Sequence, residues 1–153
     1  MSLKYSKELL VNLLSGNILV YEDDDSTLVS GLVSGAWYDK GLFKDHGWQA
    51  SVGPVIHVDA AVIDFGAQHK WYVEALQVTV WVLQKRGLNY TPERLRQDVV
   101  QKIDEILLKN AVDPSASFQF VNVSGWSERD EPEKDVLRSD LTVEVEYERE
   151  RAA

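Results

Sequence analysis

Residues 73–83 read VEALQVTVWVL, and this stretch decides the fold of the chain. Side chains of a β-strand alternate between its two faces, so residues two apart share a face. The apolar set is Leu76, Val78, Val80 and Val82, and the opposite set is Ala75, Gln77, Thr79 and Trp81. Glu74 falls on the same face as the apolar set, at its solvent end. The pattern predicts a strand with one face in the core.

Residues 141–148, LTVEVEYE, repeat this alternation more cleanly. Leu141, Val143, Val145 and Tyr147 form the apolar set, and Thr142, Glu144, Glu146 and Glu148 form the polar set. A half-buried strand of this kind is typical of an antiparallel sheet with one covered face.

Two segments have the caps and the periodicity of helices. Thr91-Pro92-Glu93 predicts a helix start, because Thr can cap free N–H groups and Pro suits the first helical position. The predicted helix covers residues 92–109, and its apolar stripe is Leu95, Val99, Ile103, Ile106 and Leu107. A shorter helix is predicted between Ser6 and Gly16, with Leu9, Leu10, Leu13 and Leu14 as its stripe. A signal peptide is the alternative for this segment, but Glu8 and Asn12 interrupt it and the helix is favoured.

The remaining elements follow from shorter runs. Residues 17–21 and 118–123 are predicted strands, 54–62 forms a hairpin with 73–83, and 128–135 is an exposed connection. Residues 26–52 are predicted to be a long irregular loop or an inserted hairpin. The result is a single α+β domain, residues 1–153, in the order α-β-loop-β-β-α-β-β. We expect a mainly antiparallel sheet of about four to five strands with two helices packed on one face.

Composition narrows the classes of function. With 16 basic and 25 acidic residues the net charge is −9, which disfavours sequence-specific nucleic acid binding. The chain has no Cys, so it has neither a thiolate nucleophile nor a Cys-based metal site. No stretch has the roughly 20 apolar residues that a membrane span needs.

Two groups of polar residues could hold a metal ion, and in both a solvated surface is the favoured interpretation. His57 and Asp59 share a face of a predicted strand, with Asp64 nearby, but alternation with apolar neighbours explains them as well. The acidic run 22–25 could attract Ca²⁺, yet it lacks the ligand spacing of a calcium loop. We therefore predict no catalytic residues, no metal and no cofactor.

Aromatic residues are the better candidates for a contact surface. Trp37, Tyr38, Phe43 and Trp48 lie in the 26–52 segment, and Trp81 lies on the polar parity of its strand. Such residues are enriched at protein interfaces. Local packing explains the loop aromatics equally well, and stacking on a sugar is less favoured.

This order of elements, closed by the strand RSDLTVEV at residues 138–145, resembles the tail-terminator and tail-completion proteins of long-tailed bacteriophages and related proviruses. The resemblance covers most of residues 5–149 and consists of architecture and that closing strand. Residues 26–52 are longer than is usual in the family.

The resemblance implies a structural subunit, not an enzyme, that forms a homohexameric ring on the tail tube, halts its growth and meets the head connector. It also implies assembly in the host cytoplasm and a final place in the virion tail. Glu144, Glu146 and Glu148 would suit the lumen of such a ring, through which DNA passes. Two alternatives stay open: a non-viral adaptor that uses the aromatic loop, and a small-ligand or metal-dependent α+β enzyme that uses His57, Asp59 and Trp71.

Overall fold

The computed structural model describes residues 6–36, 43, 46–62, 69–84, 87–109, 120–129 and 135–150, and all structural statements concern these residues. For residues 6, 9, 57–62, 69–72, 120 and 147–150 it describes the main chain alone. The fold is α+β, with two helices and a five-stranded, mainly antiparallel sheet, as the sequence predicts.

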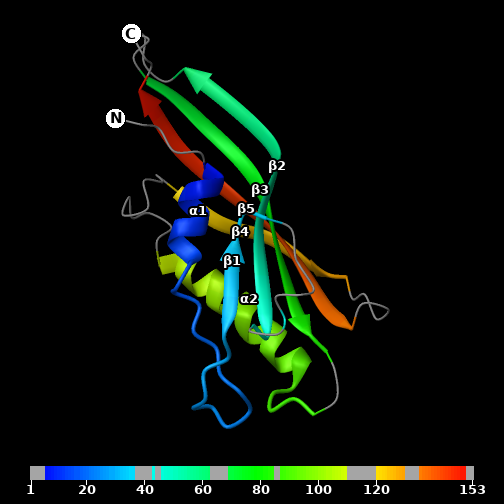
Figure 1. Cartoon of the computed structure of the whole chain (residues 1–153). Helices are drawn as coiled ribbons and strands as arrows, with labels where there is room; N and C mark the ends of the chain where they lie inside the picture. Colours follow the sequence, from blue (N-terminus) through cyan, green and yellow to red (C-terminus); the bar gives the residue numbers. More distant parts are fainter. Residues whose placement is uncertain are drawn as a thin grey trace.

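The elements follow one another as α1 (Ser6–Leu14), β1 (Gly31–Ser34), β2 (Trp48–Val62), β3 (His69–Leu83), α2 (Pro92–Lys109), β4 (Phe120–Glu128) and β5 (Val136–Glu150). In the sheet the strands lie in the order β1-β2-β3-β5-β4 (Figure 1). The last strand in the chain is thus inserted between β3 and β4, and β1 and β4 form the two edges.

The predicted hairpin and the predicted long helix are both confirmed. β2 and β3 pair antiparallel, and α2 begins at Pro92 and ends at Lys109. The stripe of α2 is buried at Leu95, Val99, Ile103 and Leu107, while Ile106 is partly buried. The helix begins where predicted because Pro occupies its first position and Leu95 N–H already donates to the Thr91 carbonyl, at 2.9 Å.

One core lies between the sheet and the two helices. The predicted apolar faces of β3 and β5 are buried from Leu76 to Val82 and from Leu141 to Val145, on the side where both helices pack. Leu10 and Leu14 of α1 are in the same cluster, and Gly16 follows that helix with a φ of 77°. Glu74, predicted at the solvent end of this face, is buried.

Residues 17–21 do not form a strand, so this prediction is wrong. Ile18 and Val20 are buried as their alternation suggests, but the segment pairs only through an isolated bridge from Tyr21 to Leu28. The chain reverses direction in the turn at residues 22–27. The two segments on either side of this turn therefore form a two-stranded ribbon with a single bridge, which is too short for a strand.

The first strand lies instead inside the 26–52 segment. β1 pairs parallel with the start of β2, with Gly31 opposite Trp48, so this pair is not a hairpin. A parallel pair needs a crossover connection, which explains the length of the segment.

β4 is longer than predicted and extends to Glu128, where the sequence suggested a connection. A register shift between Val123 and Gly125 takes up one residue as a bulge, so the strand continues past Gly125. In Figure 1 the far ends of β2, β3 and β5 extend beyond both helices, so α1 and α2 do not cover the full length of the sheet.

Candidate functional site

The polar set of β5 lies on the face of the sheet opposite the helices. Glu144 is exposed and Glu146 is half-buried, while the side chain of Glu148 lies outside the described part. β5 is an interior strand, so Glu144 lies between Ala75 of β3 and Asn122 of β4. Two hydrogen-bonded ladders therefore hold the main chain beneath these carboxylates, which makes this stripe a rigid feature of the sheet.

The other end of the same face carries cations. Arg138 donates to both carboxylate oxygens of Asp140, at 2.8 and 3.2 Å, and Arg129 lies 3.7 Å from the same carboxylate. The Arg138 guanidinium also lies 5.9 Å from the centre of the Trp81 ring, within range of a cation–π contact. The negative stripe therefore begins beyond Asp140, at Glu144.

Trp81 and Trp48 are not surface residues. The prediction of a contact surface is wrong for Trp81, and for Trp48 the alternative of local packing holds. Trp81 is 0% exposed, because the part of its face formed by β2 and β3 is closed: Gln49, Ser51 and Thr79 beside it are buried too. Ser51 Oγ donates to the Ala36 carbonyl, at 2.7 Å, which ties the chain after β1 to this face.

Trp48 is 3% exposed and belongs to the helix-side core. Its ring lies against the main chain of Gly31 in the neighbouring strand, and its Nε1–H donates to the Val29 carbonyl at 3.4 Å. Trp37 and Tyr38 lie outside the described residues, so of the five aromatic candidates only Phe43 is both described and partly exposed.

Phe43 lines a cleft of about 340 Å³ that the sequence did not reveal. His46 and Gly47 form one side and residues 87–90 another, with Glu22 at the rim. His46 Nδ1 lies 3.0 Å from Ser30 Oγ. Burial, followed by the charge of Glu22, raises the pKa of the Tyr90 phenol to about 12. A neutral phenol and an imidazole thus line a half-open space.

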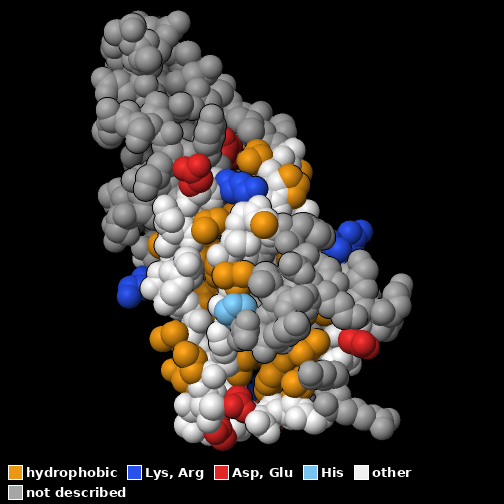
Figure 2. Space-filling view, in the orientation of Figure 1, with side chains coloured by type: hydrophobic (Ala, Val, Ile, Leu, Met, Phe, Trp, Pro, Cys, Tyr) orange, Lys and Arg blue, Asp and Glu red, His pale blue; other side chains and the backbone are white. Residues whose placement is uncertain are grey.

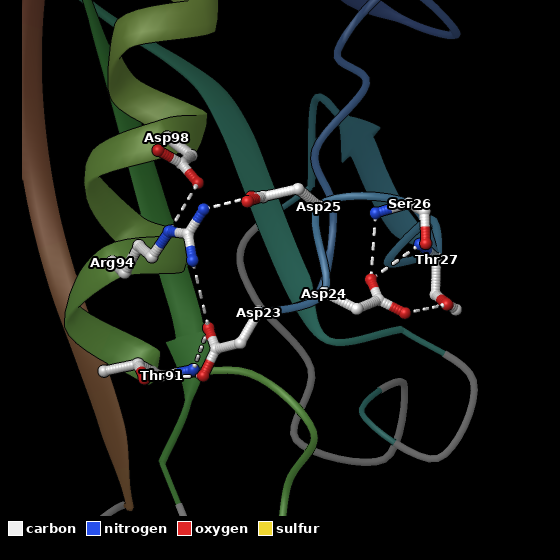
Figure 3. A network of polar contacts seen from close by, with 8 residues as sticks. All are labelled: Asp23, Asp24, Asp25, Ser26, Thr27, Thr91, Arg94 and Asp98. Atoms are coloured by element: carbon white, nitrogen blue, oxygen red, sulfur yellow. Dashed lines mark hydrogen bonds and ion pairs between the residues drawn. The ribbon is translucent and has the colours of Figure 1, made fainter.

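The acidic run 22–25 is built into a network that joins this turn to α2 (Figure 3). Asp24 accepts hydrogen bonds from both main-chain N–H groups of Ser26 and Thr27 and from the Thr27 hydroxyl. The hydroxyl and N–H groups of Thr27, followed by the Ser26 N–H, lower the Asp24 pKa to about 2. This turn is therefore closed by its own carboxylate.

The carboxylates on either side of Asp24 bind groups of α2 (Figure 3). Asp23 accepts from the Thr91 N–H and hydroxyl at 2.9 and 2.8 Å, and these bonds lower its pKa, with a further contribution from Arg94. Arg94 also pairs with Asp25 and, at 3.9 Å, with Asp98. Thr91 was predicted to cap the helix through its own side chain, and its hydroxyl is bonded to Asp23 instead.

The candidate metal ligands His57 and Asp59 lie in β2, opposite Ala75 and Val73 of β3. Their side chains and the whole of Asp64 lie outside the described part, as does the side chain of Trp71. Over the residues that are described, no group of three or more His, Asp or Glu side chains is placed to hold a metal ion.

None of the described helices is both long enough and apolar enough to cross a membrane. Comparison of the chain with models of protein families gave no match. Comparison with curated proteins gave no match either.

Proposed function

We propose that the protein is a virion-assembly subunit that resembles the phage tail terminators. In this proposal several copies form a ring at the head-proximal end of a tail tube, and the resemblance implies that the ring is a hexamer. The ring stops growth of the tube and binds the head connector. Assembly takes place in the host cytoplasm, and the protein ends in the virion tail.

The observation that carries the proposal is the outward face of β5. Glu144 is exposed at the middle of the sheet, and Glu146 follows it two residues, or about 7 Å, along the strand. Carboxylates repel the phosphates of DNA, so a lumen lined by this stripe would let DNA pass without binding it. Because the stripe belongs to an interior strand, it would keep its position when the edges of the sheet contact neighbouring copies.

The shape of the sheet gives a second support. Ring assembly needs two different surfaces on each copy, and the two edges, β1 and β4, are unlike in length and direction of pairing. The ends of β2, β3 and β5 beyond the helices offer further surface for a neighbour (Figure 1).

The first test is assembly on tubes. Purified protein is added to polymerising tail-tube protein encoded beside it, and tube lengths are measured by electron microscopy, with the particle mass measured by light scattering. We expect shorter, capped tubes and a cap mass that is a multiple of 17.4 kDa. Tubes that keep their length distribution and carry no cap contradict the proposal.

The second test concerns the lumen. A Glu144→Lys/Glu146→Lys double variant should form rings that retain DNA at low salt and release it as salt is raised. The double variant Glu93→Lys/Asp104→Lys, at two exposed sites of α2, makes the same change of net charge and is the control for charge alone. Equal DNA retention by both variants, or a ring structure with Glu144 on its outer rim, contradicts the assignment of the stripe to the lumen.

A second candidate is a non-viral adaptor, and Trp126 favours it. This residue is 64% exposed on the edge strand β4, where a large aromatic side chain suits a protein contact. The neighbouring genes distinguish the candidates, because capsid, portal or tail-tube genes are expected only for the virion subunit.

A further inference from the structure

A groove of about 210 Å³ lies between the segment that follows α1 and the outer side of α2. Leu19, Tyr21 and Asp25 line it from the segment, and Asp98, Lys102 and Glu105 line it from the helix. It is separate from the outward face of β5, which lies on the other side of the sheet.

The segment side of the groove presents apolar side chains to solvent. Leu19, Tyr21 and Leu28 are between 41% and 53% exposed, whereas Ile18 and Val20 are buried. The alternation places Leu19 and Tyr21 on the outer side of the ribbon, and Tyr21 and Leu28 are bridge partners, which adds Leu28 to the same patch. Figure 2 shows hydrophobic side chains over this segment, with acidic side chains at the lower end of the molecule.

The same segment has one open edge. Val29 N–H donates to the Val20 carbonyl and Glu22 N–H donates to the Thr27 carbonyl, at 2.9 and 2.8 Å. This makes Tyr21 and Leu28 a non-hydrogen-bonded pair, so the N–H and carbonyl of Tyr21 point away from residue 28. Those of Leu19, two residues earlier, point the same way. The edge is therefore able to pair with one more extended chain.

The charges around the groove select the sign of a partner. Asp25, Asp98 and Glu105 line the groove together with one cation, Lys102. Asp23 and Arg94 lie beside them, so four carboxylates face two cations. Arg94 is engaged by three of these carboxylates, and Lys102 pairs with Glu105 at 3.3 Å. The excess of negative charge favours a basic ligand and disfavours an acidic one.

We infer that this groove binds an extended segment of a partner protein in which basic and apolar residues alternate. The segment pairs as a strand with residues 19–21, its apolar side chains cover Leu19 and Tyr21, and its basic side chains face Asp98 and Glu105. Strand addition of this kind takes affinity from main-chain hydrogen bonds and specificity from alternate side chains. The inference does not depend on ring formation.

The probe is the acetylated, amidated peptide Lys-Val-Lys-Val-Lys-Val, titrated into ¹⁵N-labelled full-length protein and followed by NMR. We expect saturable shifts at the amides of Leu19 and Tyr21 and at residues 98–105, with a Kd of about 1 mM or below. The peptide Glu-Val-Glu-Val-Glu-Val should give none. A peptide methylated on alternate main-chain nitrogens should bind at least about tenfold more weakly, because it cannot complete the ladder.

Matched variants test the position of the site. Glu105→Lys should weaken binding about fivefold, whereas Asp104→Lys, one residue away and outside the groove, should leave the Kd unchanged. Tyr21→Ser tests the apolar contact and should also weaken binding, with the spectrum of the free protein serving as the check on folding.

Three results overturn the inference: equal binding of the acidic peptide, equal effects of the two lysine variants, or shifts confined to other surfaces. Amide shifts at residues 19–21 that change on dilution without peptide would assign the groove to a second copy of this chain instead. Each of these results is independent of whether the protein caps tail tubes.

Discussion

The packing of Trp48 against Gly31 yields a quantitative prediction. The two residues are register partners in the parallel β1–β2 pair, and a Cβ added to Gly31 would lie 1.7 Å from Cε2 of the Trp48 ring. An ordinary carbon contact is about 3.5–4.0 Å, so Gly31→Ala requires a movement of about 2 Å by a ring in the core. β1 and the Trp48 side of the core must therefore separate.

The cost of this change follows from the size of that movement. Overpacking of a core costs about 1–3 kcal/mol, and a displacement of this size belongs near the upper limit, so we expect a loss of about 3 kcal/mol of unfolding free energy. In a domain of this size that loss lowers the Tm by about 6–12 °C. Urea denaturation gives the free energy, and calorimetry gives the Tm.

Two further variants make the reasoning refutable. Gly125→Ala adds the same methyl group in β4, where nothing lies within 4 Å, and should change stability by less than about 0.5 kcal/mol. In a Trp48→Leu background the ring is gone, so the cost of Gly31→Ala should fall below about 1 kcal/mol. If Gly31→Ala costs the same in both backgrounds, or no more than Gly125→Ala, the contact with Trp48 does not explain the requirement for Gly.

Three other predictions concern the turn and the cleft. Because the Asp24 pKa is lowered to about 2, the stabilisation that its carboxylate gives the turn is complete above about pH 4 and is lost as the pH falls toward 2. NMR of the Ser26 amide should show this loss, and Asp24→Asn should abolish the titration. Because the Tyr90 pKa is raised to about 12, the neutral phenol favours the folded state below pH 10, and this preference is lost between pH 10 and 12. Absorbance at alkaline pH should show one tyrosine that ionises near pH 12, and Tyr90→Phe should remove this step. Thr91→Val removes the hydroxyl bound by Asp23 at the start of α2 and should lower the Tm by about 2–4 °C, whereas an unchanged Tm would mean that the N–H bond to Asp23 suffices.

The fold was predictable wherever one periodicity ran over many residues. The faces of β3 and β5 and the stripe of α2 are read directly from the sequence, because each needs only local alternation and a core on one side. β1 was missed because its four residues include one Gly at the start and are followed by another, and because its partner lies 17 residues further along the chain.

The candidate surfaces were harder to predict, because they depend on what covers each face. Trp81 has the parity of an exposed residue and is buried, since the second face of the sheet is closed beside Gln49 and Ser51. The acidic run was correctly predicted to lie at the solvated surface, but its contacts with Thr91 and Arg94 join residues 68 and 69 positions apart. No local pattern encodes such contacts. The open edge at Leu19 and Tyr21 is equally hidden in the sequence, because it is defined by the pairing of Tyr21 with Leu28 on the opposite side of the segment.

The position of β5 in the sheet also affects the order in which the chain can fold. β4 is synthesised before β5, yet among the described strands it pairs with β5 alone, and β3 likewise lacks a partner on that side until β5 arrives. A nascent chain that ends before residue 136 therefore exposes an unpaired edge of β3 and cannot place β4 at all. Completion of the domain must wait until Leu141, Val143 and Val145 have left the ribosome, and until then the free edge of β3 is a target for chaperones and for misassembly with other chains.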